Sequence, residues 1–234
     1  MGTGTRPAPR DQRGFTLVEM LVSMLAGIIV LSAILGVLEV SVRLSARAVD
    51  RVDATQRGRT GMEQIEQLLH SSCVASSVTP VYPSSGGSNL TFVSQFGSAV
   101  TLVPNLHTIT FAGGNLTDNV YAYTGPAGAS PPWPTSSFAS TPTSSRVLIS
   151  NVSAPSNPVF RYYKYLNGTL STTPLTTPLS TSDASATTAV EITFAVSPSS
   201  GSTEARRIVN LDDLAVLRYI PASGDPNVVN TPCQ

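Results

Sequence analysis

Glu19 is the side chain whose type and position indicate chemistry most clearly, because it stands at the edge of a long apolar run. A carboxylate inside a membrane-spanning helix costs roughly 2.5–3.5 kcal/mol unless a partner neutralises it. The arginines upstream of the run are one set of partners. The other is a free α-amino group, which exists only if the chain is cut between Gly14 and Phe15. Glu19 would then be the fifth residue of the shortened chain.

Other residues lack the spacing of a catalytic or metal site. The only histidines are His70, expected on a helix, and His107, expected at a strand edge; neither stands in a recognisable Ser-His-Asp or Cys-His-Asp arrangement. Asp212, Asp213 and Asp225 are candidate calcium ligands, but their spacing matches no defined calcium loop and favours solvated turn acids. The sequence therefore predicts no catalytic residue, no metal site, no cofactor and a non-enzymatic role.

Cys73 and Cys233 are the only cysteines of the 234-residue chain. In an oxidising compartment they could form a disulfide, which would close a loop of about 160 residues and stabilise the fold by up to roughly 5 kcal/mol. The alternative is two unrelated thiols. The sequence favours the disulfide only slightly.

The apolar run itself has the length of a membrane span. No charged residue occurs from Met20 to Leu38, a stretch that spans about 28 Å as a helix, close to the hydrocarbon thickness of a bilayer. The run is longer than the apolar region of an ordinary secretory signal. Three arginines precede it, at Arg6, Arg10 and Arg13, and they predict a cytoplasmic N-terminus with the rest of the chain outside.

Helical periodicity continues beyond this span, so we expect one long helix over residues 15–73. Its first part, about 15–39, is transmembrane, and its second part, about 40–73, is amphipathic. Gly58 and Gly61 each lower helix propensity by about 1 kcal/mol relative to alanine and predict a bend or a weak point in the helix. The apolar residues expected to pack under a following domain are Met62, Ile65, Leu68 and Leu69.

Residues 74–234 have the texture of a β-rich head. Short β-branched and aromatic runs alternate there with clusters of Pro, Gly, Ser and Thr. The predicted fold class is α+β, with the long helix packed against an antiparallel sheet. Two stretches, 124–145 and 171–188, are expected to be irregular loops, and Trp133 is expected to hold the first of them against the head.

Residues 13–21, with the sequence RGFTLVEML, resemble the processing motif of type IV prepilins and pseudopilins. The resemblance covers about the first sixty residues well and the head only loosely. It implies that residues 1–14 are a leader, which a prepilin peptidase removes after Gly14, and that Phe15 becomes the methylated N-terminus. It further implies that Glu19 pairs with the N-terminal amine of a neighbouring subunit during filament assembly. The length and loops of the head are most similar to minor pilins and to J-type or W-type pseudopilins.

The same resemblance implies partners and a location. The partners are the peptidase, other pilins or pseudopilins and an inner-membrane assembly platform. The location is the cytoplasmic membrane, crossed once with the head outside, followed by a cell-surface or periplasmic filament. The formal net charge of zero gives no indication of direct nucleic-acid binding. The motif does not distinguish a pilus from a type II secretion or DNA-uptake filament.

Two alternatives remain open. Ala46-Arg47-Ala48 satisfies the small-x-small rule of general signal peptidase, although the apolar run is too long for that route. The chain could also be a single-pass anchored binding or enzymatic domain that never polymerises.

Overall fold

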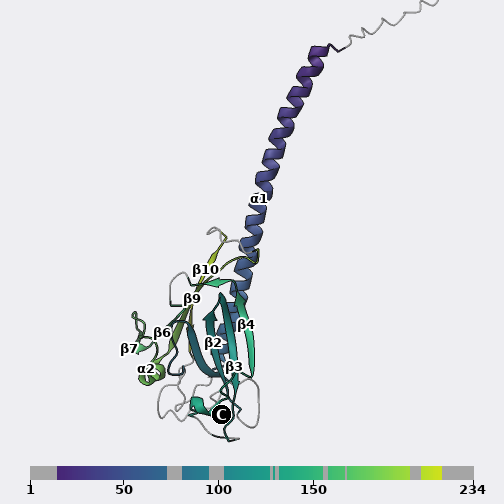
Figure 1. The fold of residues 1–234 in the computed structure, drawn as a ribbon. Helices are drawn as coiled ribbons and strands as arrows, with labels where there is room; N and C mark the ends of the chain where they lie inside the picture. The colour runs from purple at the N-terminus through teal and green to yellow at the C-terminus, as the bar shows by residue number, and fades with distance from the viewer. Residues whose placement is uncertain are drawn as a thin grey trace, which may run out of the picture. The chain divides into compact units, whose positions relative to one another are not determined.

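The computed structural model describes residues 15–72, 81–94, 103–126, 129, 132–154, 158–166, 168–200 and 207–217. Its contacts divide the chain into two compact units, residues 1–47 and 48–234. One helix, α1 (Leu17–His70), supplies the described part of the first unit and continues into the second (Figure 1). Its 54 residues correspond to about 81 Å of helix. Cys73, Cys233, Gly14 and Asp225 lie outside the described residues.

Among the described residues, the head contains two four-stranded antiparallel sheets. In the first, the strand order is β1 (Asn89–Ser94), β2 (Asn105–Ala112), β3 (Asn115–Ala122), β4 (Ser144–Ser150). In the second, β9 (Ala189–Val196) pairs with β10 (Val209–Val216) on one side and with both β5 (Val152–Ser153) and β6 (Phe160–Tyr163) on the other. A small hairpin of β7 (Tyr165–Leu166) and β8 (Thr169–Leu170), the short helix α2 (Thr181–Ala186) and a 3-10 turn, η1 (Thr135–Ser137), complete the described elements.

Local sequence explains the sharp turns of these sheets. Gly113 and Gly114 join β2 to β3 with φ values of 57° and 75°, which side chains with a Cβ rarely adopt. Asn151, with φ of 56°, joins β4 to β5 and so carries the chain from the first sheet into the second. Asparagine tolerates this left-handed conformation better than most residues.

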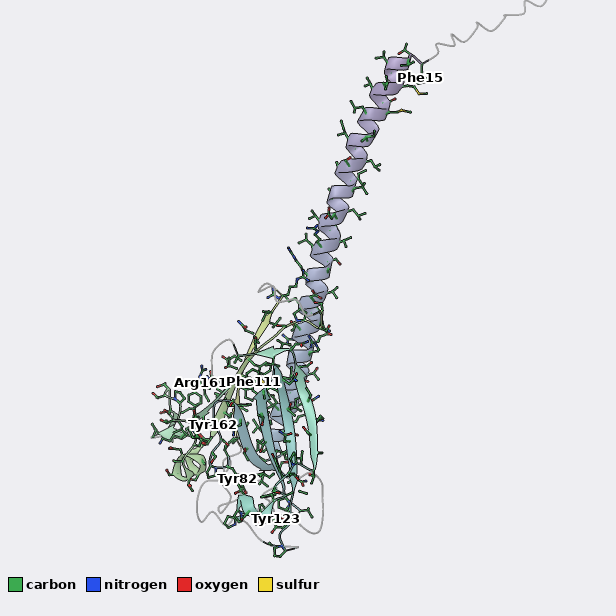
Figure 2. The ribbon with its side chains drawn as sticks, in the orientation of Figure 1. Phe15, Tyr82, Phe111, Tyr123, Arg161 and Tyr162 are labelled. Atoms are coloured by element: carbon green, nitrogen blue, oxygen red, sulfur yellow. The ribbon has the colours of Figure 1, made fainter. Side chains whose placement is uncertain are left out.

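The main core forms where the C-terminal part of α1 meets both sheets. Ala54, Ile65 and Leu69 of α1 are at most 1% exposed, and they join a single cluster with residues of both sheets. A second cluster gathers around Trp133, which is 3% exposed and donates its indole N–H to the Ala129 carbonyl at 2.9 Å. Tyr82, marked in Figure 2 near Tyr123, donates its hydroxyl to the Trp133 carbonyl at 2.6 Å. Trp133 thus holds its own loop against the head, as predicted.

The predicted α+β class, a long N-terminal helix packed against an antiparallel β-rich region, is confirmed. Three details differ from the predictions. α1 runs through Gly58 and Gly61, whose role is close packing: both are buried against strands of the head. His107 lies within β2, an interior strand, and not at a strand edge. The stretch 171–188, predicted to be irregular, contains α2.

Candidate functional site

Thr16 and Glu19 define the start of α1. The Thr16 carbonyl accepts the Met20 N–H at 3.2 Å, and the Thr16 hydroxyl accepts the Glu19 N–H at 3.3 Å, so Thr16 is the N-cap. Glu19 is the third residue of the helix, where an acid favours the helix dipole and completes the Thr-x-x-Glu spacing of a capping box. Sequence reasoning missed this local role, although the spacing was readable.

Capping does not bury the candidate assembly residues. Phe15, labelled near the start of α1 in Figure 2, has a side chain that is not covered by the head. It is 78% exposed and Glu19 is also exposed, whereas Gly14 lies outside the described residues. The structure therefore places the Glu19 carboxylate in the first turn of α1, four positions after Phe15, and open to a partner outside the chain. The cleavage and pairing roles of Gly14, Phe15 and Glu19 stay predictions.

The N-terminal part of α1 presents an apolar surface on all sides. From Phe15 to Leu44, the large apolar side chains are 56–78% exposed. Two hydroxyls on this surface bond within the helix: Ser23 donates to the Glu19 carbonyl at 2.9 Å, and Ser32 donates to the Ile28 carbonyl at 2.8 Å. Such internal satisfaction suits lipid, where no water is available. Among the described helices, α1 is the one long and apolar enough to cross a membrane.

In the head, the structure brings together a histidine and an acid that the sequence did not connect. His107 Nδ1 on β2 lies 3.0 Å from Asp118 Oδ1 on β3, and the two side chains are 5% and 4% exposed. The His107 ring stacks on Phe92 with 5.6 Å between ring centroids. The Ser94 hydroxyl is buried without a hydrogen-bond partner among the described residues. Strand register places Ser94 opposite Asn105, so it is a diagonal neighbour of His107, but its hydroxyl forms no nucleophile–base hydrogen bond with the ring.

Charged contacts fix the β9–β10 connection to α1 inside the head unit. Arg57 donates to the Ser197 carbonyl at 2.6 Å, and Asp53 accepts the Ser199 N–H at 3.0 Å and its hydroxyl at 2.8 Å. The backbone hydrogen bond from Ser199 is the largest cause that lowers the pKa of Asp53. Asp50 and Arg207 form a further ion pair. These contacts position β10 along α1.

Acidic residues gather around β10. A cavity of about 360 Å³ is lined by Glu63 and Glu66 of α1 together with Asp212 and Asp213 of β10. The hydrogen bond with Asp213, followed by burial, raises the pKa of Glu66 to about 7. In the described part of the chain, no group of three or more His, Cys, Asp or Glu side chains is arranged to hold a metal ion.

The N-terminal features and the fold together define a protein with an apolar anchor helix and an α+β head. Residues 9–35 match the family model described as the prokaryotic N-terminal methylation motif. This match indicates a type IV prepilin-like protein with a membrane anchor, as the sequence predicted. Comparison with curated proteins and with solved structures gave no significant match. The motif match covers the start of α1 and does not extend to the head.

Proposed function

We propose that this chain is a structural subunit of a type IV pilin-like filament, with no catalytic activity of its own. The chain inserts with residues 1–14 on the cytoplasmic side and the head outside. A prepilin peptidase removes the leader after Gly14 and the new amino group of Phe15 is methylated. An assembly platform in the inner membrane then moves the subunit from the bilayer into the filament, at the cell surface or in the periplasm.

One observation carries this proposal: an exposed carboxylate in the first turn of a helix whose N-terminal part has exposed apolar side chains. Glu19 and the side chains that follow it have no covering element within the described residues, so both need a partner outside the chain. Copies of the same helix can supply a partner both for the Glu19 carboxylate and for the exposed apolar side chains. Their apolar surfaces bury one another, and the amine of one Phe15 neutralises the Glu19 of its neighbour. In a dry helical core an unpaired charge would be expensive, so this pairing selects correctly registered subunits.

The length and loops of the head favour a minor pilin or a J-type or W-type pseudopilin within this class. The presence of Glu19 argues against the variant subunits that lack this residue and cap filament tips. The system served, whether pilus, type II secretion or DNA uptake, does not follow from the motif.

The test separates the charge of Glu19 from its capping role. Glu19→Gln keeps a side chain that can complete the capping box but removes the charge, whereas Glu19→Ala removes both. We expect normal cleavage and insertion of both variants and reduced filament incorporation of both. Glu39→Gln is the matched control, because Glu39 lies on the same helix in an exposed ion pair with Arg43 and should incorporate normally. Normal incorporation of Glu19→Gln would refute the pairing role.

The competing function is an anchored domain that does not polymerise. Gly27 is suited to distinguish the two, because an added Cβ there meets no atom within 4 Å and a cysteine is tolerated. A Gly27→Cys chain in a filament gives a helix-to-helix cross-linked dimer that the chain without this cysteine does not give. An anchored monomer gives no such product.

A further inference from the structure

Among the described residues, β10 and β4 are edge strands, each with one side that forms no strand pairing. β10 forms ladder pairs with β9 alone, and β4 forms them with β3 alone. The side chains of both strands are largely exposed, including Val147 of β4 at 54% and Leu214 and Val216 of β10 at 42% and 48%. An exposed edge of this kind is a template for a further strand.

The two edges carry opposite charge. β10 contains Asp212 and Asp213 and no basic residue, whereas β4 contains Arg146 and no acidic residue. Asp212 and Asp213 also line both the cavity next to α1 and a second one of about 390 Å³, whose other acidic lining residue is Glu191. Three bases lie nearby: Arg59 lines the first cavity, Arg161 lies 3.4 Å from Glu191, and Arg207, two residues before β10, pairs with Asp50. The carboxylates around β10 outnumber these bases.

We propose that β4 of one copy of this chain pairs with β10 of the next copy, so that adjacent heads share a continuous sheet. The contact joins two different surfaces, so it repeats head to tail and suits an open filament instead of a closed dimer. This inference rests on the proposed filament function and assigns the head-to-head contact within it. The chemistry of β10 calls for a basic extended segment, and β4 with Arg146 is such a segment.

Strand direction supports a parallel pairing. β5 and β10 are both antiparallel to β9, so they run in the same direction, and β4 continues through Asn151 into β5. The Val152 N–H of β5 donates to the Gly114 carbonyl at 2.8 Å, beside the pair of Ser150 of β4 with Asn115, so the chain keeps its direction from β4 into β5. In copies repeated with one polarity, β4 and β10 are therefore parallel. If Arg146 stands opposite Asp213 in this register, Val147 stands opposite Leu214. This single register therefore forms both an ion pair, Arg146 with Asp213, and an apolar pair, Val147 with Leu214.

Zero-length carbodiimide coupling tests the pairing, because it joins an amine to a carboxylate only when they are in contact. Lys164 is the only lysine, and it lies 3.8 Å from Asp183, so its coupling within the chain is an internal measure of a folded head. The test uses full-length processed Arg146→Lys chains in membranes that contain no other pilin-type protein. One half of the chains carries normal nitrogen and the other half heavy nitrogen, and mass spectrometry identifies the coupled peptides.

We expect a link from position 146 of one isotopic form to Asp212 or Asp213 of the other. Adding Leu214→Arg, which leaves both aspartates reactive but sets a cation opposite Val147, should abolish this link and retain the Lys164–Asp183 link. Ser182→Arg, at an exposed site on α2, should leave the interchain link unchanged.

Two results would overturn the proposal: no interchain link from position 146 while Lys164 couples normally, or a link from that position to another carboxylate. The Gly27→Cys cross-link, measured in parallel, separates this failure from failure of the filament function. If the helix-to-helix product forms but position 146 gives no interchain link, the strand pairing is refuted and the filament function is not. The 146 link without a helix product supports the strand pairing and contradicts the filament.

Discussion

Replacing Gly61 with alanine tests whether α1 is an integral part of the head. A Cβ built on Gly61 lies 2.0 Å from Cγ1 and 2.4 Å from Cδ1 of Ile149, both far too close. Ile149 is 3% exposed and β-branched, so its χ1 has little freedom to move away. Overpacking of this kind costs about 1–3 kcal/mol, and the gain in helix propensity offsets about 1 kcal/mol. The net expectation for Gly61→Ala is a destabilisation of roughly 1 kcal/mol.

Two other glycines of α1 serve as comparisons for the destabilisation expected for Gly61→Ala. On Gly58 the nearest atom to an added Cβ is Cδ1 of Leu211 at 2.1 Å, the end of a more flexible side chain, so Gly58→Ala should cost less than Gly61→Ala. On Gly27 an added Cβ meets nothing within 4 Å, so Gly27→Ala should leave the head unchanged. The predicted order of destabilisation is Gly61→Ala, then Gly58→Ala, then Gly27→Ala.

Thermal unfolding of the full chain in detergent, followed by Trp133 fluorescence, measures this order. Trp133 is the only tryptophan and is buried in the head. For a domain of this size, 1 kcal/mol shifts Tm by about 2–4 °C. The double variant Gly61→Ala/Ile149→Ala should be more stable than the sum of the two single effects predicts, because the smaller side chain removes the clash. A higher Tm for Gly61→Ala alone, as for a glycine in a free helix, would refute the packing.

Two further predictions concern charged contacts of α1. The pKa of Glu66 is raised from 4.5 to about 7, so between these pH values the folded head binds more protons than the unfolded chain. The stability of the head therefore falls as the pH rises through this window. Glu66→Gln should remove that part of the decline in Tm, and an unchanged pH profile of Tm would contradict the Glu66–Asp213 contact. Arg57→Ala removes the hydrogen bond to the Ser197 carbonyl and the ion pair with Asp53. It should lower the free energy of unfolding by roughly 1 kcal/mol and speed amide hydrogen exchange at Ser199. Arg59→Ala, at an exposed neighbouring site, should have neither effect. Equal exchange in both arginine variants would show that these contacts do not hold the β9–β10 connection.

The sequence predicted the features that depend on periodicity and local composition. The apolar run and the helical spacing of residues such as Ile65 and Leu69 predicted α1 and its buried face. The β-branched and aromatic runs of residues 74–234 predicted the antiparallel sheets of the head. Features that depend on contacts between distant residues could not be read in this way. The pairing of His107 with Asp118 and of Glu66 with Asp213 depends on strand register and on the position of α1.

The two helix glycines illustrate the same limit. Propensity alone predicts a weak point at Gly58 and Gly61, because sequence does not show which side chains lie opposite. The structure places Leu211 and Ile149 there, and the lack of a Cβ becomes a packing requirement. At the N-terminus, by contrast, the whole candidate site is local, and the motif that carries it was readable at residues 14–19.

Processing at Gly14 creates the amine that Glu19 needs. This step is tested by the intact mass and the N-terminal sequence of the protein recovered from membranes. We expect a chain that begins at Phe15 and carries the mass of one added methyl group. An uncleaved chain, or one that begins after Ala48, would contradict it.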